Sequence, residues 1–108
     1  MHSIEYTPIA LRDKKAIASY LALDCNSPQG AINAIASIDG AIETLKTIPQ
    51  AGRPIDDDRL ENEGYRRIVA GQYWIFYRIE SEREAVVIQR ILHQRRDITP
   101  QMYYDIDF

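Results

Sequence analysis

Residues 65–79 read YRRIVAGQYWIFYRI, and this stretch decides the fold class because its pattern repeats at every second residue. Gly71 and Gln72 interrupt the pattern, and a two-residue break with glycine first is typical of a type II′ turn between antiparallel strands. Two sets alternate along the second strand: Tyr73, Ile75, Tyr77 and Ile79 on one face, and Trp74, Phe76 and Arg78 on the other. Because both faces are mostly apolar, we expect this strand to be central in its sheet.

A third strand is predicted downstream of this hairpin. Residues 81–84 (SERE) predict a turn, and residues 85–93 (AVVIQRILH) predict a strand. Strict alternation assigns its residues to two faces: Val86, Ile88, Arg90 and Leu92 on one, and Val87, Gln89 and Ile91 on the other. The C-terminal half of the chain is therefore expected to form a three-stranded antiparallel meander.

The N-terminal half of the chain shows helical periodicity instead. Thr7 and Ser27 are N-cap residues, each followed by proline, so we expect helices over residues 8–23 and 28–48. The second helix carries a continuous apolar stripe: Ala31, Ile35, Ile38, Ile42 and Leu45. Because only DCNS (24–27) separates the helices, they are expected to form an antiparallel hairpin.

Two shorter segments complete the organisation of the chain. Ile4 and Tyr6 alternate with polar neighbours and predict a first strand, while DDDRLENE (56–63) predicts an acidic loop. The expected fold class is α+β: an N-terminal strand, an antiparallel two-helix hairpin and a three-stranded antiparallel meander. With 108 residues, the chain is expected to be a single domain (1–108) with a C-terminal tail over 99–108.

The charged residues are distributed unevenly along the chain. The net charge of −3 argues against a general nucleic-acid binder. Nine of the 13 cationic residues follow position 52, and all nine are arginine. Arginine suits bidentate recognition of carboxylate or phosphate, and it suits buried ion pairs equally well. The sequence leaves both interpretations of this arginine-rich region open.

Several other classes of protein are not indicated. Cys25 is the single cysteine, which excludes an internal disulfide and favours a reducing compartment. No apolar run approaches the length of a membrane span, and the first residues do not resemble a signal peptide, so a cytoplasmic location is expected. His2 and His93 are the only histidines, and no metal-ligand spacing or glycine-rich phosphate loop is present. We expect no metal and no cofactor.

Three motifs in this order resemble a known family. GRPIDD (52–57), YRRIVAGQYWIFYRI (65–79) and ILHQRRDI (91–98) are similar to the RelE/ParE superfamily of bacterial type II toxin–antitoxin toxins, often called plasmid stabilisation proteins. The resemblance implies a cognate antitoxin that wraps the toxin and could form a hetero-oligomer with it. It also implies one of two activities: messenger-RNA cleavage in the ribosomal A site (RelE-like), or poisoning of DNA gyrase without catalytic residues (ParE-like).

The ribonuclease alternative has candidate catalytic residues in this chain. RNA cleavage through the 2′-hydroxyl needs a base, an acid and cations that stabilise the phosphorane. His93 could be acid or base, and Arg95 lies where the resemblance implies a phosphate-contacting arginine. A carboxylate base could come from Glu61 or Glu63. Tyr103 or Tyr104 could stack on a nucleobase or donate a proton.

Departures from the nuclease pattern favour the ParE-like alternative. Trp74 stands where RelE-like nucleases carry an arginine that faces the scissile phosphate. Losing such a guanidinium typically costs a few kcal/mol of transition-state stabilisation. Asp56, Asp57 and Asp58 replace the lysines of those enzymes, and the chain is acidic overall. A third alternative is a degenerate family member that retains only antitoxin binding or autoregulation.

The candidate surface for an antitoxin or target follows from the same motifs. It comprises Arg66, Arg67, Trp74, Arg78, Arg90, Arg95 and Arg96. For His93 a structural hydrogen-bonding role is favoured over catalysis, and Arg96 with Asp97 could form a simple surface salt bridge. The acidic and aromatic tail MYYDIDF (102–108) is expected to lie against the arginine-rich sheet, with a frayed terminus as the alternative.

Overall fold

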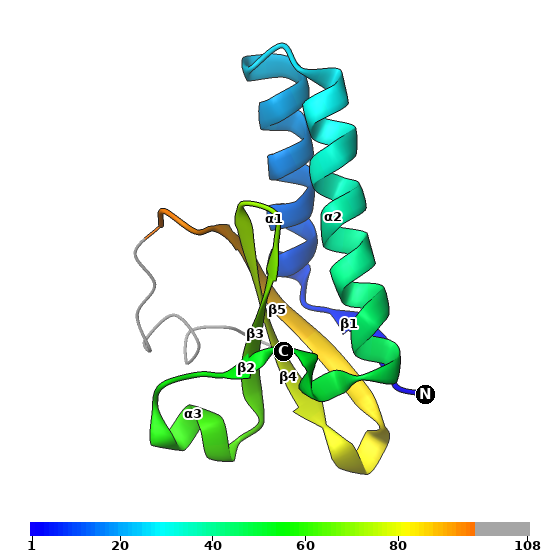
Figure 1. Cartoon of the computed structure of the whole chain (residues 1–108), viewed down its shortest axis with the longest axis vertical. Helices are drawn as coiled ribbons and strands as arrows, with labels where there is room; N and C mark the ends of the chain where they lie inside the picture. Colours follow the sequence, from blue (N-terminus) through cyan, green and yellow to red (C-terminus); the bar gives the residue numbers. More distant parts are fainter. Residues whose placement is uncertain (97–108) are drawn as a thin grey trace.

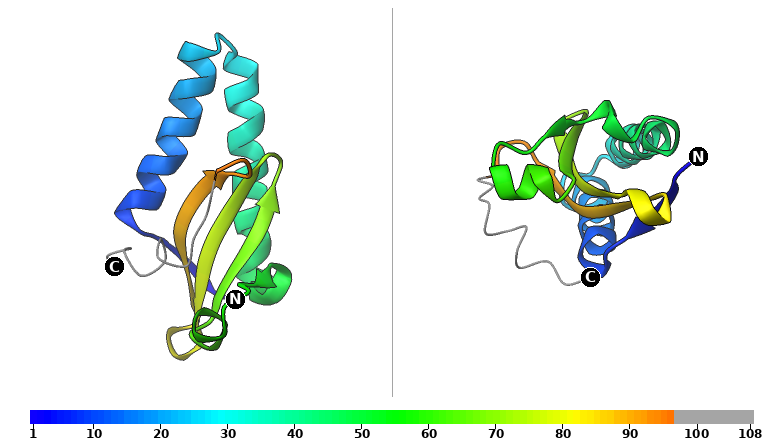
Figure 2. Two further views of the ribbon diagram at one scale, coloured as in Figure 1. Left: turned by 90° about the vertical axis from the view of Figure 1, so that its left-hand side faces the viewer. Right: turned by 90° about the horizontal axis from the view of Figure 1, so that it is seen from below.

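Two long antiparallel helices pack along a twisted sheet, and the end of the hairpin that connects them extends well beyond it (Figures 1 and 2). The computed structural model describes residues 1–96. The helices and strands are β1 (Ser3–Tyr6), α1 (Pro8–Ser19), α2 (Pro28–Thr47), β2 (Arg53–Pro54), α3 (Asp58–Asn62), β3 (Tyr65–Ala70), β4 (Tyr73–Glu80) and β5 (Ala85–His93). A π-helical turn (Tyr20–Asp24) extends α1, and 3-10 turns occupy Pro49–Ala51 and Ser81–Arg83.

The helical hairpin begins where the caps predicted it. The Thr7 hydroxyl accepts a hydrogen bond from the backbone N–H of Ala10 at 3.1 Å, and Ser27 caps α2 through Gly30 at the same distance. A side-chain acceptor at each N-cap satisfies a backbone donor that the helix itself leaves unpaired. No helix within residues 1–96 is long and apolar enough to cross a membrane.

The sheet has five strands in the order β1-β5-β4-β3-β2, so β4 is central as predicted. The turn between β3 and β4 has a positive φ of 61° at Gly71 and none at Gln72, as a type II′ turn requires. β1 pairs in parallel with β5, and the two-residue β2 pairs with β3. These two pairings add one edge strand on each side of the predicted three-stranded meander. Neither edge strand is joined to its neighbour by a hairpin turn.

The acidic stretch 56–63 is not a loop throughout, as the sequence predicted, because it contains α3. The Asp57 carboxylate accepts a hydrogen bond from the Leu60 N–H at 3.1 Å and caps this short helix. Carboxylates in a first helical turn also interact favourably with the helix dipole. Leu60 is fully buried, so the acidic stretch anchors itself to the sheet through one apolar side chain.

A β-bulge in β5 makes the predicted alternation wrong beyond Ile88. Tyr77 pairs with Ile88 but Phe76 pairs with Arg90, so Gln89 is an extra residue without a partner in the register. Ile91 therefore joins Ile88 in the core under the helices, and Leu92 packs on the opposite face. A single inserted residue is enough to exchange the faces of every residue that follows it.

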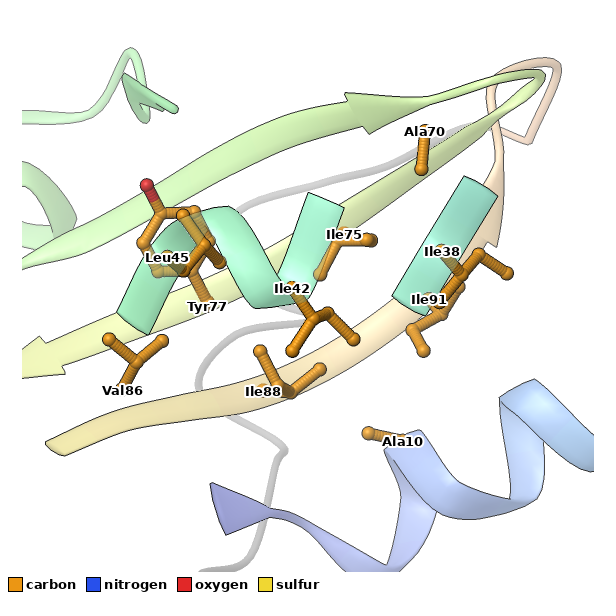
Figure 3. Packing of buried hydrophobic residues seen from close by; sticks show 10 residues of the cluster. All are labelled: Ala10, Ile38, Ile42, Leu45, Ala70, Ile75, Tyr77, Val86, Ile88 and Ile91. Atoms are coloured by element: carbon orange, nitrogen blue, oxygen red, sulfur yellow. The ribbon is translucent and has the colours of Figure 1, made fainter. Parts of the chain in front are cut away.

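The core lies between α2 and the sheet (Figure 3). Ile38, Ile42 and Leu45 of α2 are buried against β4 and β5, as the apolar stripe predicted. A second, smaller cluster lies on the other face of the sheet: Ile55, Leu60, Tyr65, Phe76 and Leu92, with Trp74 at its border. Tyr77 and Phe76 are adjacent in β4 and enter different clusters, so α2 and α3 cover opposite faces.

The GRP turn after α2 is fixed by the buried Tyr77 hydroxyl. This hydroxyl donates to the Pro49 carbonyl at 2.6 Å and accepts from the Gly52 N–H at 3.0 Å. A Cβ atom on Gly52 would lie 2.5 Å from the Arg67 carbonyl oxygen and 2.6 Å from the Tyr77 hydroxyl. Glycine is therefore required at position 52 by close approach, and the turn is locked onto β3 and β4.

Replacing Tyr77 by phenylalanine is expected to lower the free energy of unfolding at neutral pH by about 1–3 kcal/mol, because a buried N–H and a carbonyl lose their partner. Burial raises the pKa of Tyr77 above its ordinary value of 10.0. The contribution of this phenol is therefore complete below pH 10.0 and is lost as the pH rises through the raised pKa. Urea unfolding from pH 7 to 11 should show a shallower alkaline loss in the variant. Tyr20→Phe, at an exposed tyrosine, is the control at pH 7. Equal effects of the two substitutions at that pH would contradict the role of the Tyr77 hydroxyl.

Candidate functional site

One face of the sheet, opposite α2, gathers arginine and aromatic side chains. Three cross-strand pairs build it: Tyr65 with Arg78, Arg67 with Phe76, and Trp74 with Leu92. Residues directly opposite one another in an antiparallel pair share a face, so these six lie together. We call this surface the arginine–aromatic face: Tyr65, Arg67, Trp74, Phe76, Arg78 and Leu92. The sequence predicted that Trp74, Phe76 and Arg78 share a face, and the register confirms it.

Cation–π contacts organise the arginine–aromatic face. The Arg67 guanidinium lies 4.5 Å from the centre of the Trp74 ring, and that of Arg78 lies 5.8 Å from the Tyr65 ring. Arg78 also pairs with Glu80. The Nε atom of Arg67 is buried and has no hydrogen-bond partner within the described residues. Stacked guanidinium groups of this kind present their remaining donors in a fixed plane, which suits a carboxylate or a phosphate.

A second feature is a groove of about 510 Å³ beside the end of β5, which we call the strand-end groove. It lies between α1 with its π-helical turn and the last residues of the sheet. Its polar lining residues are Asp13, Tyr20, Tyr73, His93, Arg95 and Arg96. Three cationic or titratable side chains predicted from the sequence, His93, Arg95 and Arg96, therefore meet at one concave surface.

His93 is held by both ring nitrogens within this groove. Nδ1 accepts from the backbone N–H of Arg95 at 3.1 Å, and Nε2 lies 3.3 Å from the side-chain oxygen of Gln72. With Nδ1 accepting, a neutral ring carries its proton on Nε2 and donates it to Gln72. The ring also meets Tyr73 edge-on, at 5.4 Å between centroids. His93 thus ties the turn after β5 to the β3–β4 hairpin, and neither nitrogen is free in this arrangement.

The two tyrosines of the strand-end groove are held in their neutral form. Burial raises the pKa of Tyr73, with the nearby Cys25 adding to the effect. A hydrogen bond with Cys25 raises the pKa of Tyr20. Both phenols therefore act as neutral hydrogen-bonding groups near pH 7 and are unsuited to act as general bases. Arg95 and Arg96 are exposed at the rim and have no ion-pair partner within residues 1–96.

The structure does not bring the candidate acid and base of a ribonuclease together. Glu63 follows α3 beside Gly64, whose carbonyl accepts from Ile79 near the end of β4. His93 pairs with Tyr73 at the beginning of β4. Six residues of strand separate these positions, a distance of about 20 Å. Glu61 belongs to α3 as well, and Tyr103 and Tyr104 lie outside the described residues.

Two of the predicted binding arginines, Arg66 and Arg90, make internal contacts. Arg66 donates to the carbonyl oxygens of Gln50 and Gly52, the latter at 2.7 Å, and so belongs to the GRP turn. Arg90 forms a bidentate pair with Asp13 of α1, at 2.8 and 3.1 Å. The same carboxylate accepts from the Ile91 N–H at 2.9 Å. These contacts fasten the turn and α1 to the sheet.

Three of the polar groove residues were not among the predicted site residues: Asp13, Tyr20 and Tyr73. Asp13 is separated from Arg90 by 77 positions, and the local sequence gives no signal of their pairing. The alternation of β4 placed Tyr73 on an apolar face, and only the three-dimensional structure shows that Tyr73 and Tyr20 lie in the groove. The one signal in the sequence that could have indicated these groove residues is a tyrosine near the end of a strand, as at Tyr73.

The strand, helical hairpin and five-stranded sheet agree with the fold that the resemblance to the RelE/ParE superfamily implies. The chain matches the family described as "ParE toxin of type II toxin-antitoxin system, parDE" over residues 4–98. It belongs to that family.

Related sequences and structures agree with this assignment. The chain is 40% identical over 58 residues to "Toxin ParE1" from two strains of Mycobacterium tuberculosis (CDC 1551 / Oshkosh and ATCC 25618 / H37Rv). That match covers 54% of this chain and 55% of the relative, so the chain spans about half the length of the curated relatives it matches.

Two solved structures share the fold. One, described as "Chromosomal ParDE TA system from P. aeruginosa", has a TM-score of 0.67 and 24% identity and covers 86% of this chain and 96% of that chain. The other is the toxin–antitoxin complex RelBE2 from Mycobacterium tuberculosis, with a TM-score of 0.62 and 24% identity, covering 86% and 98%. At this level of identity they establish the fold.

Proposed function

We propose that this chain is a toxin that arrests bacterial growth by binding DNA gyrase in the cytoplasm, and that a cognate antitoxin neutralises it. The observation that carries the proposal is the match to the ParE family over residues 4–98. Separation of Glu63 from His93 supports it, because a nuclease needs its acid and base at one phosphate. Trp74, which the Arg67 guanidinium contacts, also stands where the resemblance implies the arginine of a RelE-like nuclease.

The antitoxin is proposed to cover the arginine–aromatic face. The solved relatives are described as a ParDE system and as a toxin–antitoxin complex, which supports a protein partner for this chain too. Trp74 is partly exposed over a buried cluster and is contacted by the Arg67 guanidinium, while Arg78 lies over Tyr65 farther along the same face. Interfaces are enriched in arginine and aromatic residues, and a few of these residues carry most of the binding energy.

Ribosome-dependent RNA cleavage remains the second candidate because of the strand-end groove. This groove places His93, Arg95 and Arg96 beside Tyr20 and Tyr73. Cationic and aromatic side chains around one concavity can hold a phosphate and stack on a base. Cleavage by this route would require a catalytic carboxylate other than Glu63, or none.

Inducible expression in a bacterium separates the two candidates. With wild-type protein we expect growth arrest, double-strand DNA breaks and an SOS response, with messenger RNA left intact, because gyrase poisoning leaves cleaved DNA. Deep sequencing of RNA ends and gel analysis of plasmid supercoiling provide the readouts. Arg95→Ala tests the groove, with Arg12→Ala, an exposed arginine of α1, as the matched control. Codon-phased RNA cleavage abolished only by Arg95→Ala would overturn the gyrase proposal in favour of a ribonuclease.

A further inference from the structure

We propose that the strand-end groove is the surface with which this chain binds its target, and that the occupant is an extended gyrase segment carrying carboxylates and apolar side chains. This inference rests on the proposed function and gives the target and the antitoxin different surfaces. The groove lies beside α1, where β4 begins and β5 ends, whereas the arginine–aromatic face lies opposite α2. Both surfaces are formed by described residues, and the tail predicted over residues 99–108 lies outside them.

The strand-end groove carries positive charge that no described residue neutralises. Arg95 and Arg96 are exposed and form no ion pair within residues 1–96. Asp13 is the only acidic residue that lines the groove in this part of the chain, and its carboxylate already accepts from Arg90 and from the Ile91 N–H. Two consecutive free guanidinium groups favour a partner with carboxylates, which accept bidentate hydrogen bonds from arginine.

The turn that carries these two arginines is fixed to the β3–β4 hairpin. The Gln94 N–H donates to the Gln72 carbonyl at 3.0 Å, and Nε2 of His93 lies 3.3 Å from the side-chain oxygen of Gln72. Within the turn, the Arg95 N–H donates to Nδ1 of His93, and the Arg96 N–H donates to the His93 carbonyl. Because the backbone of both arginines is held before a partner arrives, binding costs less ordering entropy.

The rest of the groove lining indicates a protein segment as the occupant and not a nucleic acid. Ala16, Ile17 and Ile91 supply apolar surface, and Tyr20 and Tyr73 add aromatic rings. Arginine and tyrosine beside apolar side chains are typical of protein interfaces, whereas nucleic-acid interfaces are much more positively charged. The net charge of −3 also opposes binding of a polyanion.

The concave surface continues beyond Tyr73, which indicates an extended occupant. A second groove of about 290 Å³ lies between the beginning of α2 and the β3–β4 turn, and Tyr73 lines both grooves. Small residues line much of this second groove: Gly30, Ala34, Ala70 and Gly71. Small side chains let the main chain of a partner approach closely. An isolated anion would contact only the arginines, but an extended segment can follow both grooves.

Surface plasmon resonance with the immobilised full chain and purified, DNA-free gyrase holoenzyme tests this assignment. Arg95→Ala/Arg96→Ala should weaken binding at least about tenfold at low salt, because two cations that face carboxylates are lost. The difference should shrink as the salt concentration rises to about 0.5 M, because screening then weakens the same ion pairs in the wild type. The matched control is Lys15→Ala/Lys46→Ala, which removes the same charge outside both grooves and should change affinity less than about threefold.

Tyr20→Ala is a second, uncharged test of the groove. Tyr20 is 57% exposed, so its truncation should leave the fold intact, which far-UV circular dichroism verifies. Gyrase binding should weaken about tenfold at every salt concentration, because an aromatic contact is not screened.

Three results would count against the assignment. Wild-type affinity in both groove variants would overturn it while the proposed function holds. An effect of the arginine substitutions that appears only when gyrase carries DNA would identify a nucleic acid as the occupant and overturn it as well. Absence of any binding between the wild-type chain and gyrase would overturn the proposed function together with the assignment, so the two failures are distinguishable.

Discussion

Replacing Asp13 by alanine is expected to lower the free energy of unfolding by about 3 kcal/mol, because removing one partner of a largely buried ion pair leaves the other charge uncompensated. Asp13 and Arg90 side chains are only 13% and 14% exposed, and the pair is bidentate. The substitution also leaves the Ile91 N–H without its acceptor. Urea unfolding at pH 7 measures the loss.

Two comparisons separate the ion pair from a general effect of substitution in α1. Asp39→Ala breaks the Lys14–Asp39 pair, whose carboxylate is 53% exposed, and should cost no more than about 1 kcal/mol. Arg90→Met removes the cation beside Asp13 but keeps the apolar stem of the side chain and the hydrogen bond from the Ile91 N–H to the carboxylate, so it should be less harmful than Asp13→Ala. If Asp13→Ala cost as little as Asp39→Ala, Asp13 and Arg90 would not fasten α1 to the sheet.

The elements that the sequence predicted well are those whose signals are local. N-caps at Thr7 and Ser27, the stripe of α2 and the Gly71-Gln72 turn each depend on residues within a few positions of one another. The energetic gain of capping or of a type II′ turn is likewise local, so pattern and structure agree. Two-residue alternation in β4 placed Trp74 and Arg78 on one face for the same reason.

The elements that the sequence did not predict depend on distant contacts. The parallel β1–β5 pair joins the two ends of the domain, and β2 is too short to show any period. The bulge at Gln89 is a single inserted residue. The residues on both sides of it still alternate, so the sequence pattern does not show where the register shifts. Its consequence reaches the site, because it turns Leu92 to the arginine–aromatic face.

The same distinction applies to the predicted binding arginines, of which some contact aromatic rings and others make internal hydrogen bonds. Arg67 and Arg78 lie over aromatic rings on the arginine–aromatic face. Arg66, next to Arg67 in β3, donates to backbone carbonyl oxygens. Arg90, in β5, pairs with Asp13. Composition identifies arginine as important but does not distinguish a binding group from an internal ion pair.

Replacing Trp74 by alanine is expected to weaken binding of the cognate antitoxin about 100-fold, or about 2.7 kcal/mol, a loss typical of a central aromatic residue in an interface. Trp74 is stacked under the Arg67 guanidinium, so its loss also releases that cation from its fixed orientation. Isothermal titration calorimetry with purified antitoxin measures the change. Arg67→Ala, which removes the cation that Trp74 orients, should weaken binding by about tenfold.

The matched control for this experiment is Arg12→Ala on α1, an exposed arginine away from the arginine–aromatic face, which should change affinity less than about threefold. An antitoxin that bound Trp74→Ala as tightly as the wild type would show that it covers a different surface. The strand-end groove would then be the next candidate, tested by Arg95→Ala/Arg96→Ala. Because Trp74 borders a buried cluster, the variant must first match the wild type in circular dichroism. Only then does lost affinity report on the interface and not on the fold.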